Sequence, residues 1–489
     1  MEKDVEYRTV QIRIKKTHSL FQFCDNACFA SKNLYNVGNF HIRQIFSGLK
    51  KEPGTLHQNE TDVFEKIEAQ LEKLNAIKLT TFDKQKTKAS LEGTPFSKKE
   101  PTQLMLPNKE KSFLGFNLLD GMLKLTSQPD YIAMPAQVNQ QTLKLLYQDW
   151  KSFFEGLKAY KKDPSSFTGR PRIPNYAKKN GRKVAIFTNQ NCTLKVVNDR
   201  NILTFPKTKL TLDMGTHSLP NGIFKESRIV PESNFYAVEL IFAVAKELTA
   251  PPLLTEEATN IIGIDLGVNN FATISNNIGV QPIVVKGGIL KARNQWYNKR
   301  RAYLYGVLRA GKTNNQGPFT SKNLNRLDTI RHLFMKDYFH KASRIIINYC
   351  IENGIDTIVL GKNVGWKQSV HMNRPNKQNF SSIPYEIFIA MLDYKAREVG
   401  IRFVLTEESY TSKASFLDRD VMPVYGNKNS VPVFSGKRIK RGLYQAQDGT
   451  LINADVNGSF NIIRKVFPNA FTGERDRGYV NSPKSLLVA

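Results

Sequence analysis

The sequence predicts a multidomain α/β protein: a small β-barrel, a block of helices inserted into it, and a mixed α/β domain behind them. Three observations predict this architecture. Residues 184–246 contain a run of short β-prone segments, residues 17–160 carry helical periodicity, and strands alternate with helices after residue 255. The chain has 489 residues, 40% of them hydrophobic, which is enough for two or three domains with real cores.

The first strand and the helical block precede the rest of the barrel. Apolar and polar residues alternate in residues 7–14, as in a half-buried strand. Helical periodicity follows, with helices expected near 61–74 and 136–160. The expected boundaries are therefore 1–16 and 164–250 for the barrel and 17–163 for the inserted helical lobe.

The net charge of +28 indicates a polyanionic partner. Lys and Arg number 71 against 43 acids, and the excess is spread along the chain. Nucleic acid is the expected partner. An anionic membrane is the alternative, but no apolar run reaches the ~18 residues that a spanning helix needs. We therefore expect no membrane partner, and the N-terminus carries no secretory signal pattern.

Cysteine usage predicts a reducing compartment. The four cysteines form no CxxC pair, and Cys24 and Cys28 are one helical turn apart, as two small apolar residues of a core would be. We therefore expect a cytoplasmic protein.

Two segments combine cations with aromatic residues. Residues 167–183 are extended by prolines, and residues 290–306 form an expected helix. Each is either a solvated surface or a contact with a nucleic-acid backbone; in the first, prolines lower the cost of ordering the cations. The candidate nucleic-acid-binding residues are Arg170, Arg172, Lys178, Lys179 and Arg182 in the first segment and Arg293, Lys299, Arg300 and Arg301 in the second.

The order of elements after a linker at 250–258 is that of an RNase H-like fold. The expected elements are strands at 261–266, 271–276 and 282–286, then helices, a strand at 355–360, a helix at 385–399, a strand at 401–406 and a last helix near 455–467.

Four acids stand where this fold places the ligands of two divalent ions. Asp265 lies at the centre of the first strand, Asp455 begins the last helix, and Glu407 and Glu408 follow the strand at 401–406. Buried carboxylates are usually paired or bind a metal. The alternatives are a turn aspartate for Asp265, a helix N-cap for Asp455 and solvated glutamates at a strand end.

Several strings in this half resemble the TnpB proteins of insertion sequences, compact ancestors of type V CRISPR effectors. They are "GIDLGVNNFATIS", "VLGKNVGWKQ", "NKQNFSSIPY", "TEESYTSKASFLD" and "DGTLINADVNGSFNIIRK", with weaker echoes upstream such as "GRPRIPNY". The resemblance covers nearly all of 255–467. It implies an RNA-guided DNA endonuclease with a RuvC nuclease domain, a wedge-like β-barrel and a helical recognition lobe. The partners it implies are a guide RNA and a target DNA, double- or single-stranded, beside a short flanking motif.

The sequence departs from the family pattern at two places. The family usually carries a glutamate at the end of the fourth RuvC strand, where this chain has Gly361 and Lys362. Glu407 or Glu408, at the end of the next strand, is the expected replacement. The family often has a zinc ribbon before the last aspartate, but the insertion at 416–452 has no cysteine, so no zinc is expected. A C-terminal tail follows at 468–489.

The resemblance and the acids together predict metal-dependent phosphodiester hydrolysis. Two Mg²⁺ ions activate water and neutralise charge in such sites, and Mg²⁺ prefers carboxylate oxygens. Asp265 would bridge both ions, Asp455 would hold one, and Glu408, or else Glu407, would hold the other. The main hypothesis is an RNA-guided DNA endonuclease, monomeric with its RNA. The alternatives are a nuclease-inactive RNA-guided DNA-binding regulator and a DDE-type transposase, which would not explain the barrel and the helical lobe.

The charge yields the first testable prediction: the protein purifies with bound RNA, and that binding weakens steeply with salt. Each phosphate contact releases a counterion, so the logarithm of the affinity should fall linearly with the logarithm of the salt concentration. Extraction of the purified protein and a salt titration measure both effects. A stable RNA-free preparation without salt-dependent RNA affinity would contradict the prediction.

Overall fold

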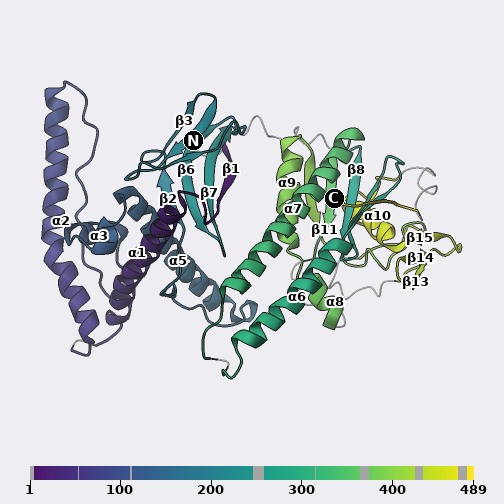
Figure 1. Ribbon diagram of the computed structural model, residues 1–489, viewed down its shortest axis with the longest axis horizontal. Coiled ribbons are helices and arrows are strands. Elements are labelled where there is room, and N and C mark those ends of the chain that lie inside the picture. Colours follow the sequence, from purple (N-terminus) through teal and green to yellow (C-terminus); the bar gives the residue numbers. More distant parts are fainter. Residues whose placement is uncertain are drawn as a thin grey trace. The chain divides into compact units, whose positions relative to one another are not determined.

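The computed structural model describes residues 5–52, 54–110, 113–245, 258–313, 315–363, 374–423, 433–471 and 482–488 (Figure 1). The chain divides into two compact units, residues 1–244 and 245–489. Most of the expected linker at 250–258 and Trp366 of the "VGWKQ" string lie outside the described residues. The domain boundaries expected from sequence stay predictions.

The helices of the first unit follow the periodic apolar pattern. They are α1 (Phe21–Gly48), α2 (Gln58–Leu91), α3 (Phe116–Leu125), α4 (Pro129–Ile132) and α5 (Ala136–Lys162), with a short 3₁₀ turn at Pro164–Ser166. Helix α2 is longer than the expected 61–74 because it continues beyond its last buried residue, Leu74, as an exposed polar helix. Cys24 and Cys28 are buried in α1, which confirms their expected packing role.

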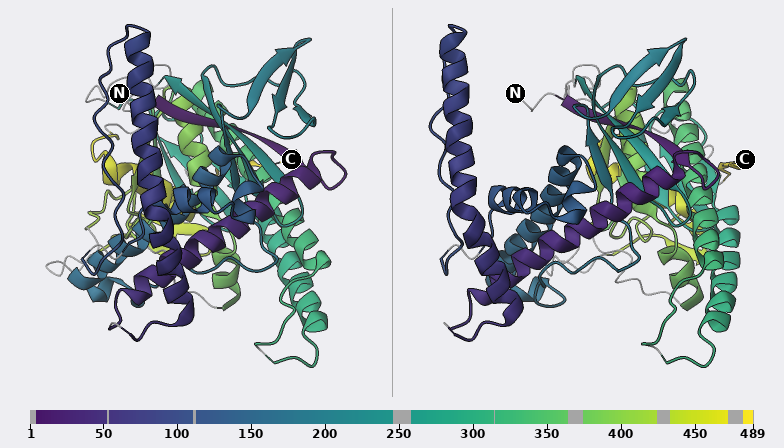
Figure 2. Two further views of the ribbon diagram at one scale, coloured as in Figure 1. Left: turned by 90° about the vertical axis from the view of Figure 1, so that its left-hand side faces the viewer. Right: turned by 60° about the vertical axis from the view of Figure 1, so that its left-hand side comes forward.

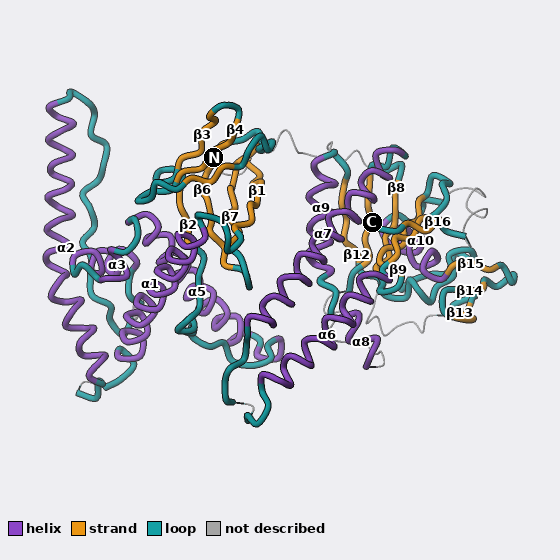
Figure 3. Tube along the Cα trace, viewed as in Figure 1, coloured by secondary structure: helices purple, strands orange, loops and turns teal. Residues whose placement is uncertain are grey.

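The strands of the first unit form two sheets (Figure 3). The larger has the order β1-β7-β6-β2, from β1 (Val5–Ile14), β7 (Tyr236–Ala245), β6 (Ile223–Pro231) and β2 (Ala185–Thr188). The smaller has the order β3-β4-β5, from β3 (Thr193–Val197), β4 (Arg200–Thr204) and β5 (Thr211–Asp213). The early strand therefore pairs with strands that follow the helices in the chain, as the sequence predicts.

The expectation of a closed β-barrel is wrong for the described strands. Closure would require β1 and β2 to pair, but they are the two edges of an open sheet. Helices α1 and α5 pack on this sheet instead. In α1, Ser31 Oγ donates to the carbonyl of Val184 at 2.8 Å and Cys28 Sγ donates to that of Ile229 at 3.3 Å. The helices thus bury apolar sheet surface that a barrel would bury by curling on itself.

A six-stranded mixed sheet organises the second unit. Its order is β12-β11-β8-β9-β10-β16, from β12 (Arg402–Thr406), β11 (Thr357–Gly361), β8 (Ile261–Leu266), β9 (Asn270–Asn276), β10 (Ile283–Lys286) and β16 (Lys484–Leu486). Strand β8 pairs in parallel with β11 and antiparallel with β9, and β12 continues in parallel beyond β11. The element order expected for this half is confirmed. Strand β16, within the predicted tail, was not expected.

Helices α7 (Lys322–Glu352) and α9 (Tyr385–Glu398) cover one face of this sheet, and α10 (Ala454–Val466) covers the other. Helix α6 (Gly288–Leu308) packs on α7 and on α8 (Arg374–Ser381) (Figure 2). Phe271 of β9 packs on Phe339 of α7 and Phe388 of α9, with ring centroids 5.6 and 4.6 Å apart. On the other face, Ile462 and Ile463 of α10 cluster with residues of β8 and β11.

The described part of the cysteine-free insertion is held by β pairing. Strands β13 (Lys437–Lys440), β14 (Leu443–Gln445) and β15 (Leu451–Asn453) form an antiparallel sheet that leads into α10. Asp420 accepts hydrogen bonds from the main chain of Ser415 at 2.7 Å and of Ser435 at 3.0 Å. Residues 424–432 lie outside the described part. None of the described helices is long and apolar enough to cross a membrane.

Candidate active site

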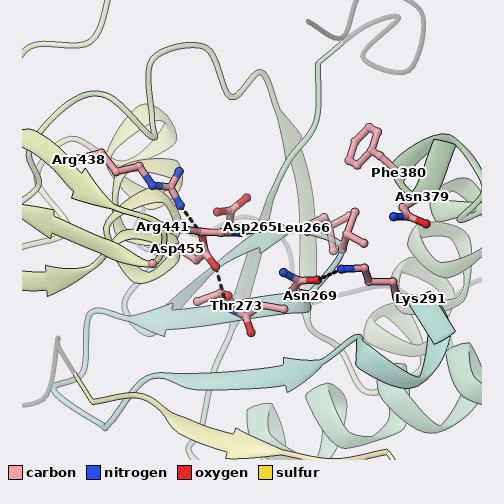
Figure 4. Close-up of a pocket in the computed structure, with 14 residues that line it drawn as sticks. Asp265, Leu266, Asn269, Thr273, Lys291, Asn379, Phe380, Arg438, Arg441 and Asp455 are labelled. Carbon is pink, nitrogen blue, oxygen red and sulfur yellow. Dashed lines mark hydrogen bonds and ion pairs between the residues drawn. The ribbon is translucent and has the colours of Figure 1, made fainter. Parts of the chain in front are cut away.

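A cavity of about 580 Å³ lies at the carboxyl end of β8 (Figure 4). Its lining comes from β8, the turn into β9, and from α6, α8, the β13–β15 sheet and α10. Two acids, Asp265 and Asp455, line it together with three cations, Lys291, Arg438 and Arg441. A cavity that presents both charges can bind a metal ion through its acids and a phosphate group through its cations.

Asp265 points to the face of the sheet that α10 covers. Successive strand residues alternate between faces, so Asp265 shares its face with Gly263, while Ile262 and Ile264 pack on the α7 and α9 side. Helix α10 approaches closely at Gly458, where an added Cβ would lie 2.9 Å from Asp265 Oδ2. The carboxylate therefore sits in a buried strand and still reaches the cavity.

Asp455 lies in the first turn of α10 and is not its N-cap. Asn453 is the cap, and its Oδ1 accepts the main-chain N–H groups of Asp455 at 3.0 Å and Val456 at 3.2 Å. The Asp455 carboxylate faces the cavity, accepts a hydrogen bond from Asn270 Nδ2 at 2.7 Å and lies 3.5 Å from Arg438 Nη2 (Figure 4). The N-cap alternative for Asp455 is therefore wrong.

The two glutamates that follow β12 face different surroundings. Glu407 forms an ion pair with Lys465 of α10, and its other oxygen accepts the N–H of Ser409 at 2.8 Å. It lines a separate cavity of about 450 Å³. Glu408 lies near Asp265, and its charge acts on the Asp265 carboxyl. Of the two glutamates, Glu408 is the one whose charge acts on Asp265, whereas Glu407 is paired with Lys465.

Glu408 fills the space beside the end of β11. An added Cβ on Gly361 would lie 3.1 Å from the Cβ of Glu408 and 2.6 Å from Cδ1 of Ile462. Any side chain at position 361 would therefore have to displace one of these two residues. Lys362 turns to a different partner, because its Nζ pairs with Glu386 at 2.7 Å.

The three carboxylates repel one another. Burial first, and then the charges of Glu408 and Asp455, raise the pKa of Asp265 well above its usual value, while Arg438 lowers it. Burial raises the pKa of Glu408 from 4.5 to about 7. A bound cation would relieve this repulsion and favour the ionised carboxylates.

The donor set fits hard divalent cations held by pairs of acids. No three His, Cys, Asp or Glu side chains in the described part of the chain lie close enough to hold one ion together. Asp265 and Asp455 line the same cavity, and the charges of Asp455 and Glu408 both act on the Asp265 carboxyl. Mg²⁺ is commonly bound through one or two carboxylates, with water and substrate phosphates completing its shell. The carboxylates of Asp265 and Asp455 suit such an ion at the cavity.

The cations expected to bind nucleic acid are mostly exposed. Arg170, Arg172, Lys178 and Lys179 have exposed side chains, as do Lys299, Arg300 and Arg301 of α6. Arg182 is an exception because Nε and Nη2 donate to the Asp25 carboxylate at 3.0 and 2.8 Å. That pairing anchors the loop to α1. Arg293 is half-buried, 4.7 Å from the ring centre of Trp296 and 5.1 Å from that of Phe334.

Sequence reasoning missed the cations of the cavity. Arg438 and Arg441 belong to the run "KRIKR" at 437–441 and line the cavity. This run lies in the insertion at 416–452, from which only the lack of cysteine was interpreted. Lys291 lies in the first turn of α6, and its Nζ donates to Asn269 Oδ1 at 3.1 Å (Figure 4). The run has four cations in five residues and comes shortly before the helix that bears Asp455. That density of positive charge was the sequence signal for cations near the candidate site.

Comparisons with known proteins agree with the resemblance read from the motifs. Residues 244–367 match the OrfB_IS605 family, described as a probable transposase, and residues 385–462 match the Cas12f1-like TNB domain. A TnpB-like protein, ORF457 of Acidianus two-tailed virus, is 26% identical over 217 residues, which are 43% of this chain and 42% of that protein. The chain thus aligns with less than half of the relative's length. These segments are similar to TnpB-type proteins, and the predicted resemblance is confirmed.

Two solved structures align with most of this chain at low sequence identity. One is the Cas12f1–sgRNA–target DNA complex, with a TM-score of 0.42, 14% identity and coverage of 94% of this chain and 99% of that one. Another is AacC2c1 with sgRNA and extended non-target DNA, with a TM-score of 0.40, 9% identity and coverage of 83% and 69%.

The Glu407–Lys465 pair predicts a stability effect separate from the cavity. The Lys465 side chain is 7% exposed, so Glu407→Ala would leave a buried ammonium without its partner. We expect a loss of about 1–3 kcal/mol, below that of a fully buried pair because Glu407 is partly exposed. Thermal unfolding of Glu407→Ala, Lys465→Met and the double variant measures it. The double variant should be more stable than Glu407→Ala; equal melting temperatures for all three and the parent would refute the pair's role.

Proposed function

We propose that the chain is an RNA-guided DNA endonuclease whose second unit is an RNase H-like nuclease domain of the RuvC type. One observation carries the proposal: Asp265 and Asp455, from a strand and a helix far apart in the chain, line one cavity at the end of β8, and the charge of Glu408 acts on the same Asp265 carboxyl. The proposed domains are the sheet-forming segments 1–16 and 164–250 as a wedge, 17–163 as a recognition lobe and 255–467 as the nuclease. The proposed partners are a guide RNA and a target DNA beside a flanking motif, with the protein monomeric on its RNA.

Glu408 can take the role of the glutamate that the family usually carries where this chain has Gly361. This supports an active nuclease rather than one that has lost its site. At the end of the fourth strand, where the family usually has a glutamate, this chain has Gly361. Because glycine has no side chain, it leaves room for Glu408. Strand β12 lies directly beyond β11, so a side chain from its end can reach over Gly361 toward Asp265. The acid is thus supplied from the neighbouring strand, and the total of three carboxylates is kept.

The residues of the cavity divide into two roles in this proposal. Asp265, Asp455 and Glu408 would hold two Mg²⁺ ions, which when bound supply an activated water and neutralise charge on the leaving oxygen. Arg438, Arg441 and Lys291 would position the scissile phosphate, because cations at the wall bind phosphate oxygens directly. Asn270 orients Asp455, and Lys286 Nζ in turn donates to Asn270 Oδ1 at 3.1 Å.

A nuclease-inactive RNA-guided DNA-binding regulator is the second candidate. The absence of an acid at Gly361 and the proximity of Arg438 to Asp455 favour it, since an arginine can neutralise an aspartate without a metal. The two candidates differ in one outcome, cleavage of a plasmid in the presence of Mg²⁺ and the co-purified RNA.

Alanine substitution of the three acids separates these candidates. Asp265→Ala, Asp455→Ala and Glu408→Ala should each reduce cleavage by about a thousandfold, equivalent to about 4 kcal/mol, because bound metals supply several kcal/mol of charge stabilisation. Target binding should be retained. Lys362→Ala and Glu407→Ala are the controls and should cleave nearly normally at a temperature where they are folded. Wild-type cleavage by Glu408→Ala would refute the relocated acid, and no cleavage by the parent would favour the regulator.

The raised pKa values of Asp265 and Glu408 predict a pH-dependent effect of Mg²⁺ on stability. Since folding raises both pKa values, ionising these carboxyls costs stability as pH rises in the metal-free protein, and for Glu408 this loss falls between about pH 4.5 and about pH 7. Mg²⁺ binds the ionised forms, so its increase of the melting temperature should be larger at pH 8 than at pH 6. Asp265→Asn should abolish this difference. An increase independent of pH, or one kept in Asp265→Asn, would place the ion elsewhere.

A further inference from the structure

Thr273 of β9 carries a buried hydroxyl that has no hydrogen-bond partner among the described residues. The residue is 1% exposed, and its Oγ1 is shielded from solvent. A buried hydroxyl without a partner costs stability, whereas a valine has the same shape and no polar atom. Buried polar groups of native proteins are nearly always hydrogen-bonded, so this exception requires a physical explanation.

Thr273 stands directly opposite Asp265. The two residues are in register in the antiparallel pair of β8 and β9, and both line the cavity of the candidate active site (Figure 4). Residues paired in this way share a face of the sheet, with Cβ atoms about 4.5–5.5 Å apart. At that separation a rotation of either side chain can bring the hydroxyl to the carboxylate. On its other side Thr273 is paired with Val284 of β10, whose side chain offers no acceptor.

Asp265 lacks the support that the second acid of the cavity has. The Asp455 carboxylate accepts a hydrogen bond from Asn270 Nδ2 at 2.7 Å and lies 3.5 Å from Arg438 Nη2. The Asp265 carboxylate accepts no hydrogen bond from the residues that the structure describes. An acceptor without a donor and a donor without an acceptor therefore stand side by side on neighbouring strands.

Ser275, two residues further along β9, has the partner that Thr273 lacks. Its Oγ lies 2.7 Å from Oγ of Ser459 in α10, and both serines are fully buried. Closer to the cavity, α10 presents Gly458 to Asp265, and glycine has no side chain that could pair with a hydroxyl or a carboxylate. The helix thus satisfies the hydroxyl of Ser275 and leaves that of Thr273 to Asp265.

We propose that Thr273 is a positioning residue for Asp265: its hydroxyl donates to the Asp265 carboxylate when that carboxylate holds a divalent cation, and so fixes the orientation of the carboxylate. The inference rests on the proposed metal site and adds a residue to it. A carboxylate that binds a metal keeps free lone pairs, and hydrogen bonds to them orient it and strengthen metal binding. A hydroxyl bond to an ionised carboxylate is also stronger than one between neutral groups.

Two variants separate this role from a packing role. Thr273→Val keeps the shape of the side chain and removes the hydroxyl, whereas Thr273→Ser keeps the hydroxyl and removes the methyl group. The probe is Mn²⁺ in place of Mg²⁺, because electron paramagnetic resonance measures its free concentration. The full-length protein with its co-purified RNA is titrated beside Asp265→Ala, whose binding is subtracted because RNA also binds ions. We expect Thr273→Val to weaken the Asp265-dependent binding about tenfold and Thr273→Ser to keep it within about twofold.

Melting temperatures without added metal give the second measurement. Thr273→Val should melt at the temperature of the parent or above it, because it removes an unpaired buried hydroxyl. A hydroxyl that served only the packing would give the opposite result, a lower melting temperature with unchanged Mn²⁺ affinity. Ser275→Ala is the matched control on the same strand and face. It removes the hydrogen bond to Ser459, so it should lower the melting temperature and leave Mn²⁺ binding unchanged.

Unchanged Mn²⁺ affinity in Thr273→Val would overturn the inference, and so would a Thr273→Ser variant that binds the ion as weakly as Thr273→Val. A parent that binds no more Mn²⁺ than Asp265→Ala would overturn the metal site itself, and this inference with it. Ion binding is measured without cleavage. A protein that binds the ion through Asp265 and Thr273 but does not cut DNA would support the positioning role and contradict only the nuclease proposal.

Discussion

The close packing of α10 on β8 is the contact on which the candidate site depends. Gly263 in the strand and Gly458 in the helix lack the Cβ atoms that would collide with Ser459 and Asp265. The approach is reinforced by a buried hydrogen bond between the hydroxyls of Ser275 and Ser459, 2.7 Å apart. Because the helix lies so near the strand, its first turn brings Asp455 to the cavity that Asp265 lines.

The packing of α10 on β8 places negative charges near Asp265, and their repulsion destabilises the fold. Three carboxylates lie near one another, and burial and mutual repulsion raise the pKa of Asp265. Arg438 offsets part of that repulsion, and packing elsewhere must supply the rest. The stacked and edge-on rings around Phe271, and the apolar residues of α10, provide such packing on the two faces of the sheet. A strained group of acids surrounded by a rigid core is what a cation-binding site requires.

The order of strands in the sheet explains how Glu408 can serve as the third acid. Strand β12 lies beside β11, so the end of either strand can supply a carboxylate to the same side of the sheet. The glycine at position 361 excludes nothing from that space, and Glu408 enters it. The ion pair of Glu407 with Lys465 and the hydrogen bond from the Glu408 N–H to Asn363 Oδ1, at 2.9 Å, fix the direction of the chain there. Two adjacent glutamates thereby acquire different surroundings.

The sequence by itself determined the elements of the second unit and the acids that could meet there. Apolar periodicity is a local property, so strands such as β8 and helices such as α10 could be read from it, together with the asymmetry of an acid in a buried strand. Whether the first sheet closes, and which glutamate acts on Asp265, were decided by tertiary structure. Each of these depends on contacts between segments distant in the chain: helices α1 and α5 on the open sheet, Lys465 with Glu407, and β12 beside Gly361. The cavity's cations were equally hidden, because a basic run gives no sign of which acids its arginines will face until β13–β15 fold beside α10.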